Sequence, residues 1–205
     1  MQKSVSENRD KFIGGSDISI IMQLSHFKDR YTLLLEKAGL KEIEQVNNAY
    51  VDYGNIMEPK IRQYINTLYQ RNFVEDKLEK SDIRCHFDGI DDEMILEIKT
   101  TSQVHEKITD YKVYLVQLLF YMMNANKNQG MLAVYERPQD FDEAFDDDRL
   151  QFVKFYDDQD RVQTRICYYD STLGTSMVYD TNGNYLYQME YNKDSEGNIY
   201  SCAKF

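Results

Sequence analysis

The spacing of apolar residues predicts helices in the first third of the chain. Ser16 precedes the run DISIIMQL, and Asp29 precedes RYTLLLEKA, which ends at Gly39. A side-chain oxygen before such a run and a glycine after it are typical of helix ends, so we expect two short helices with Ser16 and Asp29 as caps. A third helix is expected over roughly residues 57–70, with Pro59 near its start or at a kink. Its apolar residues recur at helical spacing, at Met57, Ile61, Tyr64, Ile65 and Leu68.

Beyond residue 70 the pattern changes to short runs typical of strands. Three strands are expected at FVEDKLE, DIRCHFDGI and EMILEIKTT, with Asp91 and Asp92 as the turn between the last two. Residues 111–124 return to helical spacing, and MLAVYER follows as a short apolar strand. The apolar face of that helix is expected at Val113, Val116, Leu119, Phe120 and Met123. This order predicts an α/β protein with a mixed central sheet flanked by helices.

The last quarter of the chain has only strand-like runs. They alternate with turn-forming Asp, Asn and Gly residues at 157–160, 181–184 and 196–197. We therefore expect a core of residues 1–168 and a C-terminal extension of β-hairpins, residues 169–205, packed on that core.

Composition restricts the class of protein. Hydrophobic residues make up 42% of 205 residues, which is typical of a folded chain. No apolar run approaches the roughly 18 residues that a membrane-spanning helix needs. Residues 1–9 are polar where a secretory signal would be apolar. Cys85, Cys167 and Cys202 are far apart and form no C-x-x-C, so neither a disulfide framework nor a zinc site is expected. The sequence predicts a cytoplasmic protein without membrane partners.

The net charge is unevenly distributed. The formal charge is −11, which argues against a protein that coats nucleic acid in general. Residues 140–160 hold nine acidic residues against Arg149 and Lys154, so seven of the eleven excess charges lie there. The charge therefore does not exclude DNA as a partner, but any DNA-binding surface must be local, and metal ions would have to offset nearby carboxylates.

One predicted strand carries charges where apolar residues are expected. In MILEIKTT, alternation places Leu96 and Ile98 on one face and Ile95, Glu97 and Lys99 on the other. Taken alone, this pattern is typical of a solvated face with a weak ion pair.

The preceding strand changes that interpretation. It ends with Asp88 beside Gly89, and a tight connection lets Asp88 and Glu97 meet at one end of the hairpin. Two converging carboxylates and the backbone carbonyl of Ile98 form an oxygen site of the kind that Mg²⁺ prefers. Lys99 beside them would hold or activate the water that the metal polarises.

The spacing D-x8-E-x-K, from Asp88 through Glu97 to Lys99, resembles that of the PD-(D/E)xK nucleases. Three further matches resemble the lambda-exonuclease or YqaJ-type viral recombinase branch of that superfamily. The first is GNIMEP, which is similar to the G-x-x-x-E helix of the branch and places its glutamate at Glu58.

The other two matches lie on either side of this region. Tyr114 and Gln117 are one helical turn apart after E-x-K, like the Y-x-x-Q of the branch. Arg9 and Ser16 have the spacing of the Arg and Ser that bind a terminal 5′-phosphate there. The resemblance covers about residues 6–170 and implies a restriction-endonuclease-like core.

The resemblance also implies a function. The chain would be a Mg²⁺-dependent exonuclease that degrades linear double-stranded DNA in the 5′ to 3′ direction and leaves 3′ single strands for phage-type recombination. Two ions are implied, with Mn²⁺ as a substitute. The implied partners are DNA ends, a single-strand annealing recombinase and further copies of the chain in a ring-shaped trimer, in a bacterial host or phage-infected cell.

The implied site residues fall into three groups. The metals would be held by Asp88, Glu97, the Ile98 carbonyl and Glu58. The nucleophile and substrate would be ordered by Lys99, Gln117 and Tyr114. The 5′-phosphate would be bound by Arg9 and Ser16.

The residues themselves leave simpler interpretations open. Arg9 can be an exposed charge near a terminus, and Ser16 a helix cap. Gln117 can be a hydrogen-bonded core amide, and Glu58 an acid that stabilises the first turn of a helix.

The chain also departs from the family pattern. His86 and Phe87 precede Asp88 where relatives often have a small residue and proline, and His86 is either structural or a phosphate contact when protonated. Residues 170–205 are expected to form hairpins where the lambda enzyme ends in helix, and this departure argues against carrying over the implied trimer. An endonuclease with the same core and a binding module on a nuclease scaffold are the alternatives.

Overall fold

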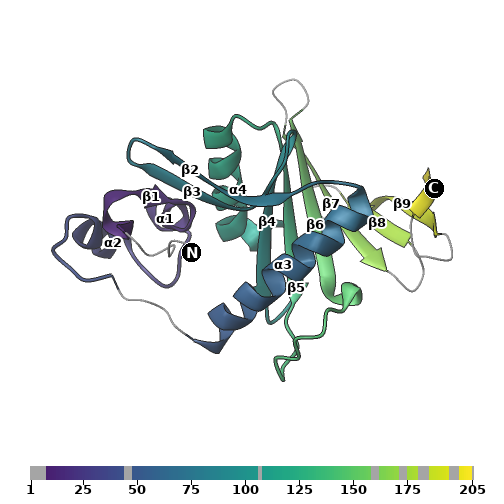
Figure 1. The fold of residues 1–205 in the computed structure, drawn as a ribbon, viewed down its shortest axis with the longest axis horizontal. Coiled ribbons are helices and arrows are strands. Elements are labelled where there is room, and N and C mark those ends of the chain that lie inside the picture. Colours follow the sequence, from purple (N-terminus) through teal and green to yellow (C-terminus); the bar gives the residue numbers. More distant parts are fainter. Residues whose placement is uncertain are drawn as a thin grey trace.

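The fold is a long mixed β-sheet with helices on both faces (Figure 1). The computed structural model describes residues 8–43, 48–105, 108–157, 162–170, 175–179, 185–193 and 199–204. The helices are α1 (Gly15–Ile21), α2 (Arg30–Lys37), α3 (Ala49–Tyr69) and α4 (Lys112–Ala125), with short 3₁₀ turns η1 (Arg9–Lys11), η2 (Ile108–Tyr111) and η3 (Asp147–Arg149). The strands are β1 (Ile13–Gly14), β2 (Val74–Lys80), β3 (Ile83–Ile90), β4 (Met94–Thr101), β5 (Gln129–Glu136), β6 (Leu150–Asp157), β7 (Val162–Asp170), β8 (Thr175–Tyr179), β9 (Tyr185–Lys193) and β10 (Ile199–Lys204).

The sheet confirms the predicted fold class. Its order is β1-β3-β4-β5-β6-β7-β8-β9-β10, with β2 paired to β3. The β1–β3 and β4–β5 pairs are parallel, and the other pairs are antiparallel. The connection from β4 to the parallel β5 runs through α4, as a parallel crossover requires.

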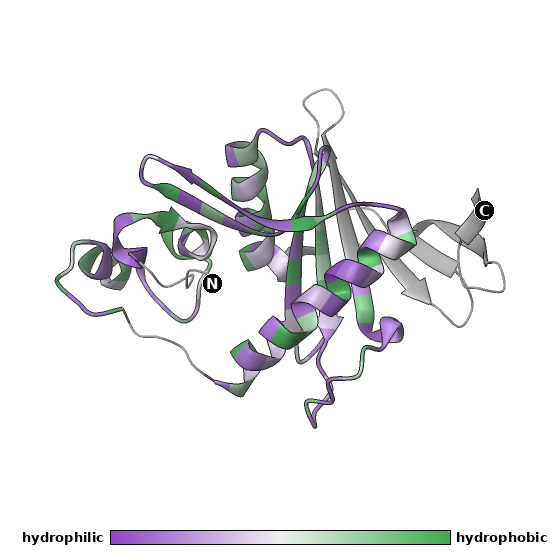
Figure 2. Ribbon diagram, viewed as in Figure 1, coloured by the Kyte–Doolittle hydropathy of each residue, from purple (hydrophilic) through white to green (hydrophobic). Residues whose placement is uncertain are grey.

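Two apolar clusters fill the two sides of this sheet. On one side α3 packs Met57, Ile61 and Ile65 against Leu96 and Ile98. On the other side the cluster combines α4 with β3, β4 and β5, through Leu118, Tyr121, Met122, Cys85, Phe87, Ile95, Leu132 and Val134. Figure 2 shows the corresponding apolar stretches on β4 and β5 and the mixed polarity of α3. The alternation predicted for MILEIKTT is thus confirmed.

Strand β3 changes partners along one of its edges. β2 runs along the other edge from Val74↔Ile90 to Lys80↔Ile83. β4 pairs with β3 at Gly89↔Leu96 and Ile90↔Ile95, whereas β1 pairs with it at Ile83 and Arg84. Residues 85–88 therefore lie between the part of this edge that β1 covers and the part that β4 covers. The β2–β3 hairpin accordingly projects from the main sheet toward α1 and α2 (Figure 1).

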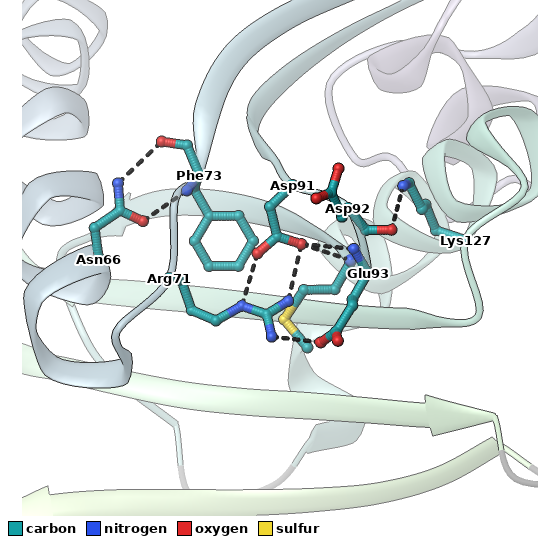
Figure 3. Close-up of polar contacts among 8 residues, drawn as sticks. Asn66, Arg71, Phe73, Asp91, Asp92, Glu93 and Lys127 are labelled. Carbon is teal, nitrogen blue, oxygen red and sulfur yellow. Dashed lines mark hydrogen bonds and ion pairs between the residues drawn. The ribbon is translucent and has the colours of Figure 1, made fainter.

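The predicted turn between β3 and β4 is confirmed and is held by a cluster of charged residues (Figure 3). Arg71, just after α3, donates to both carboxylate oxygens of Asp91, at 2.6 and 2.8 Å, and to Glu93 at 2.6 Å. The Oδ1 atom of Asp91 also accepts from the N–H groups of Glu93 and Met94. This turn cluster fixes the register that places Asp88 opposite Glu97.

The predicted helix ends are partly wrong. α2 is confirmed, because Asp29 accepts from the Thr32 N–H and Gly39 adopts a positive φ of 70°. α1 begins at Gly15, so Ser16 lies inside the helix and is not its cap. The carboxylate of Asp17 reaches back to the Gly14 N–H at 2.8 Å and satisfies that end instead.

α3 is longer than predicted. It begins at Ala49 rather than near residue 57, because Asn48 caps it by accepting from the N–H groups of Tyr50 and Val51. Pro59 consequently lies inside the helix and not near its start.

The predicted face of α4 is wrong in part, since Leu119 and Phe120 pack against the core cluster but are only partly buried. Its buried residues are Leu118, Tyr121 and Met122, whereas Met123 is 81% exposed. Apolar residues surround almost the whole helix, so the sequence predicts the helix but does not specify which face is buried.

The C-terminal strands continue the same sheet. β6 to β10 follow one another as antiparallel neighbours, which confirms the strands predicted there. The turn residues predicted at 158–160, 181–184 and 196–197 lie outside the described residues. A division into domains at residue 168 stays a prediction. Among the helices that the structure describes, none is long and apolar enough to cross a membrane.

Candidate functional site

Asp88 lies at the point where β3 leaves β4. Its Oδ2 atom accepts from the backbone N–H of Ile98 at 2.7 Å. In a continued β3–β4 ladder the Ile98 N–H would donate to a backbone carbonyl of β3. Here it donates to the Asp88 side chain instead. Since Gly89 faces Leu96, antiparallel register places Asp88 opposite Glu97. The two carboxylates therefore lie on neighbouring strands at the same level.

Glu97 is a fully buried carboxylate with incomplete partners. Its side chain has 0% exposure, and its Oε1 atom forms an ion pair with Lys99. Its Oε2 atom is buried and has no hydrogen-bond partner among the described residues. Burial raises the pKa of Glu97 to about 8, helped by the charge of Asp88 and opposed by Lys99. The positive charge of Lys99 thus does not fully compensate for the burial of the Glu97 carboxylate.

Lys99 lies between the two acids. Its Nζ is 3.9 Å from Asp88 Oδ2 and 5.9 Å from the centre of the Tyr114 ring. Burial alone would lower the pKa of Lys99, but Glu97 and Asp88 outweigh that effect and raise the pKa above its ordinary value. Lys99 is therefore a charged hydrogen-bond donor in this arrangement.

Glu58 is held by a residue that the sequence analysis missed. Arg62, one turn later on α3, donates to Glu58 Oε1 at 2.9 Å and also to the backbone carbonyl of Asp88. The same guanidinium lies 3.7 Å from Glu75 Oε2 on β2. Burial raises the pKa of Glu58, and so does Asp88, while Arg62 lowers it. The i,i+4 spacing of an acid and an arginine was the available signal in the sequence.

Gln117 and Tyr121 form a second contact on α4. Gln117 Nε2 donates to the Tyr121 hydroxyl at 3.2 Å, so the bond described for Gln117 goes to Tyr121 rather than to Lys99. Tyr121 is 4% exposed, and burial raises its pKa, as does the charge of Glu97. A Cβ on Gly15 would lie 2.4 Å from the Tyr121 hydroxyl, so α1 contacts α4 directly behind the site.

The two N-terminal candidates lie together. Arg9 Nη2 donates to Ser16 Oγ at 3.1 Å. Lys37, from α2, fixes this segment by donating to the carbonyls of Arg9 and Phe12, at 2.8 and 2.6 Å, and by pairing with Asp17 at 2.7 Å. β1, between these two residues in the chain, pairs with the strand that carries Asp88. One strand therefore links the Arg9–Ser16 pair to the carboxylates.

The two residues before Asp88 differ in their surroundings. Phe87 packs edge-on against Tyr121, with ring centres 5.4 Å apart, so it is part of the core. His86 has a buried Nε2 atom without a hydrogen-bond partner among the described residues. Burial lowers the pKa of His86, and Arg84 and Lys77 lower it further, which favours the neutral imidazole.

The site supplies oxygen atoms of the type that a hard cation takes, but, among the described residues, no preformed cluster of side chains. Within the described ranges, no three His, Cys, Asp or Glu side chains are grouped closely enough to hold a metal ion by themselves. Asp88, Glu97 and the Ile98 carbonyl nevertheless supply oxygen ligands of the type Mg²⁺ takes. The unpartnered Oε2 atom of Glu97 is the feature that a cation would satisfy.

Comparison with solved structures identifies the class of fold. A phage-related exonuclease from Haemophilus somnus 129PT aligns with a TM-score of 0.53 and 16% identity, over 72% of this chain and 85% of that chain. LHK-Exo in complex with dAMP aligns with a TM-score of 0.50 and 16% identity, over 72% of this chain and 78% of that one. At this identity the likeness shows the fold, which is that of the phage exonucleases.

The family follows from the sequence itself. The model of the YqaJ-like viral recombinase domain matches residues 6–128, and the chain belongs to that family. No curated protein matches the chain. The matched region includes every candidate residue of the site, from Arg9 to Gln117.

Proposed function

We propose that this protein is a metal-dependent exonuclease that acts on the ends of linear double-stranded DNA. At each DNA end it would degrade, in the 5′ to 3′ direction, the strand whose 5′ terminus lies there. The other strand would remain as a 3′ single strand for phage-type recombination. The observation that carries the proposal is the arrangement of Asp88, Glu97 and Lys99 where β3 leaves β4. Two facing carboxylates, one of them buried and unsatisfied, and a charged lysine are costly to place together without a ligand.

Each residue has a physical task in this reaction. Asp88, Glu97 and the Ile98 carbonyl would hold Mg²⁺, or Mn²⁺ in its place. The ion would stabilise charge on the phosphate and lower the pKa of the attacking water. Lys99 would donate to that water or to a phosphate oxygen and so orient it. Glu58 would support this site from α3, and Tyr114 would lie beside Lys99 to guide the substrate.

The Arg9–Ser16 pair supports the preference for ends. A guanidinium and a hydroxyl together bind a terminal phosphate through charge-assisted hydrogen bonds. Asp88 lies four residue steps along β3 from Arg84, the residue that pairs with β1, and these steps span about 13 Å. A 5′-phosphate bound by the Arg9–Ser16 pair would therefore bring a nearby phosphodiester linkage to Asp88. This placement would set the direction of degradation. A single-strand annealing recombinase and further copies of this chain are the partners that we propose.

The test is digestion of matched linear duplexes with 5′-phosphate or 5′-hydroxyl ends and of a closed circle, each in Mg²⁺. We expect loss of one strand from phosphorylated ends and no cutting of the circle. Cutting of the circle would instead indicate an endonuclease with the same core. Absence of cutting with any metal would indicate a binding module, and calorimetry for Mg²⁺ would then show no carboxylate-dependent site.

A further inference from the structure

Lys37 is a cation that α2 directs into the protein rather than into solvent. It is the last residue of α2, and its side chain is 14% exposed. Its Nζ atom donates to the carbonyl oxygens of Arg9 and Phe12, at 2.8 and 2.6 Å, and lies 2.7 Å from Oδ2 of Asp17. One ammonium group therefore joins the turn that carries Arg9 to the helix that carries Ser16.

Asp17 is the acid whose charge this ammonium group matches. Its side chain is 3% exposed, and its Oδ2 atom also accepts from the Gly14 N–H at 2.8 Å. A buried carboxylate that loses its cation is costly, so it attracts any other positive charge within reach. Arg9 is placed to respond, because its guanidinium already contacts Ser16, the residue directly before Asp17.

Arg9 stays uncommitted while Lys37 occupies Asp17. Within the described part of the chain its guanidinium forms no ion pair with an acid, and it donates to Ser16 Oγ at 3.1 Å. Arg9 and Ser16 are both exposed, so an anion from solution can reach them. The arrangement thus separates a buried, matched ion pair from an exposed cation that can take a ligand.

We propose that Lys37 is a positioning residue for end recognition, which neutralises Asp17 and so keeps Arg9 free to bind a terminal phosphate. The inference rests on the proposed function of the Arg9–Ser16 pair and adds the residue that keeps this pair available. Lys37 does not contact the phosphate in this role. It acts through Asp17 and through the backbone carbonyls of the turn.

The test compares binding of two DNA hairpins whose single open end has either a 5′-phosphate or a 5′-hydroxyl, by fluorescence anisotropy with Ca²⁺ in place of Mg²⁺. The readout is the ratio of the two dissociation constants, which a loss of stability alone does not change in the folded protein. The wild type should prefer the phosphate by about tenfold or more, as a charge-assisted hydrogen bond predicts. Lys37→Met should bring the ratio to within about twofold of one, because Arg9 then pairs with Asp17.

Lys28→Met is the matched control. Lys28 lies just before α2 and donates to both carboxylate oxygens of Glu36, each at 2.7 Å, and the Glu36 side chain is 3% exposed. This variant loses a comparable ion pair to a buried acid, so it should lose stability as Lys37→Met does, but it should keep the wild-type ratio.

A double variant tests whether the competing charge is that of Asp17. Asp17→Asn keeps an oxygen that can accept from the Gly14 N–H and removes the negative charge. Alone it should keep the preference for phosphate, and combined with Lys37→Met it should restore the preference that Lys37→Met loses.

The outcomes distinguish this inference from the proposed function. An unchanged ratio in Lys37→Met, a lost preference in Lys28→Met or no recovery in the double variant would overturn the role of Lys37 and leave the exonuclease in place. No preference in the wild type would overturn it together with the proposed binding of a 5′-phosphate by Arg9 and Ser16. Since the readout is binding, an absence of cleavage would overturn the proposed function and leave the inference standing. Thermal denaturation establishes that each variant is folded, and Lys37→Gln, with the same expected ratio, replaces Lys37→Met if that variant does not fold.

Discussion

Two arginine–carboxylate clusters border the same pair of strands, and they differ in how completely their charges are matched. At the turn, Arg71 binds both oxygens of Asp91, and two backbone N–H groups bind Asp91 as well. At the site, Arg62 binds Glu58, but Glu97 keeps a buried oxygen without a partner among the described residues. The same residue types therefore form two kinds of cluster. In the closed cluster at the turn, both oxygens of the buried acid have partners, and in the open cluster at the site one oxygen of the buried acid has none among the described residues.

The pKa values of the two acids shift in opposite directions. Burial would raise the pKa of Asp91, but its hydrogen bonds to Arg71 and to the turn N–H groups outweigh this and lower it. Burial, together with the charge of Asp88, raises the pKa of Glu97 to about 8, because Lys99 opposes these effects without outweighing them. The turn cluster stabilises the fold, whereas the site has an electrostatic cost that a bound cation would relieve.

The largest expected effect is on cleavage. Lys99→Met should reduce DNA cleavage by about 10²- to 10⁴-fold, because it removes the donor that orients the reacting groups. Affinity for DNA, measured by fluorescence anisotropy in Ca²⁺, should change little. Lys127→Met is the matched control, since Lys127 donates to the Asp92 carbonyl at the turn. Full cleavage by the Lys99 variant would contradict the assignment of the site.

A variant of the turn cluster should lose stability and keep cleavage, which is the reverse of the effect expected at Lys99. Arg71→Met should lower the free energy of unfolding by about 2–3 kcal/mol, because it leaves two carboxylates without their cation. The cleavage rate of the folded fraction at 25 °C should match the wild type, since Arg71 is outside the site. Urea denaturation and single-turnover digestion measure the two quantities. A loss of cleavage without a loss of stability would mean that the two clusters do not have separate roles.

The sequence predicted those features that depend on local pattern. Alternation in β4 specifies which side Glu97 and Lys99 face, and a tight turn at Asp91 then places Asp88 opposite Glu97. The spacing D-x8-E-x-K could therefore be interpreted correctly as two facing strands. The capping by Asp29 was equally local, since it needs only the following turn of the chain.

The missed features depend on contacts between distant segments or on a weak pattern. Arg62 reaches the carbonyl of Asp88 from another element, and spacing along the helix cannot show that contact. The first turns of α3 are mostly exposed, so no apolar face marks its beginning at Ala49. The predicted face of α4 was wrong in part, because a helix that is apolar all round does not show which face will be buried until its neighbours are known.

Packing extends the comparison to two glycines on different helices, Gly15 on α1 and Gly54 on α3. Gly15→Ala would bring a methyl group 2.4 Å from the buried Tyr121 hydroxyl. It should lower stability by about 1–3 kcal/mol through overpacking. Gly54→Ala on α3 meets its nearest atom, Thr100 Oγ1, at 3.4 Å. It should raise stability by about 0.5–1 kcal/mol, because alanine is the better helix former. Equal melting temperatures for both variants would contradict a tight contact between α1 and α4.

The last prediction concerns the pH dependence of the turn cluster. Asp91 is 10% exposed, and its pKa in the folded protein lies below the ordinary 3.8. A lowered pKa in the folded state means that the contribution of the carboxylate is present above pH 3.8 and is lost as the pH falls through the folded pKa. Asp91→Asn should therefore lower stability by about 1–2 kcal/mol near neutral pH, where the charge-assisted bonds to Arg71 are lost.

The difference in stability between the wild type and Asp91→Asn should shrink as the pH falls below 3.8, since the wild-type carboxylate then becomes protonated and loses its charge. Chemical denaturation of both proteins across this range, in the absence of metal, measures it. A difference that stays constant as the pH falls would mean that the bonds from Arg71 to Asp91 do not depend on charge. The closed cluster would then stabilise the turn through its geometry, and the contrast with the open cluster at Glu97 would rest on hydrogen bonding rather than on matched charge.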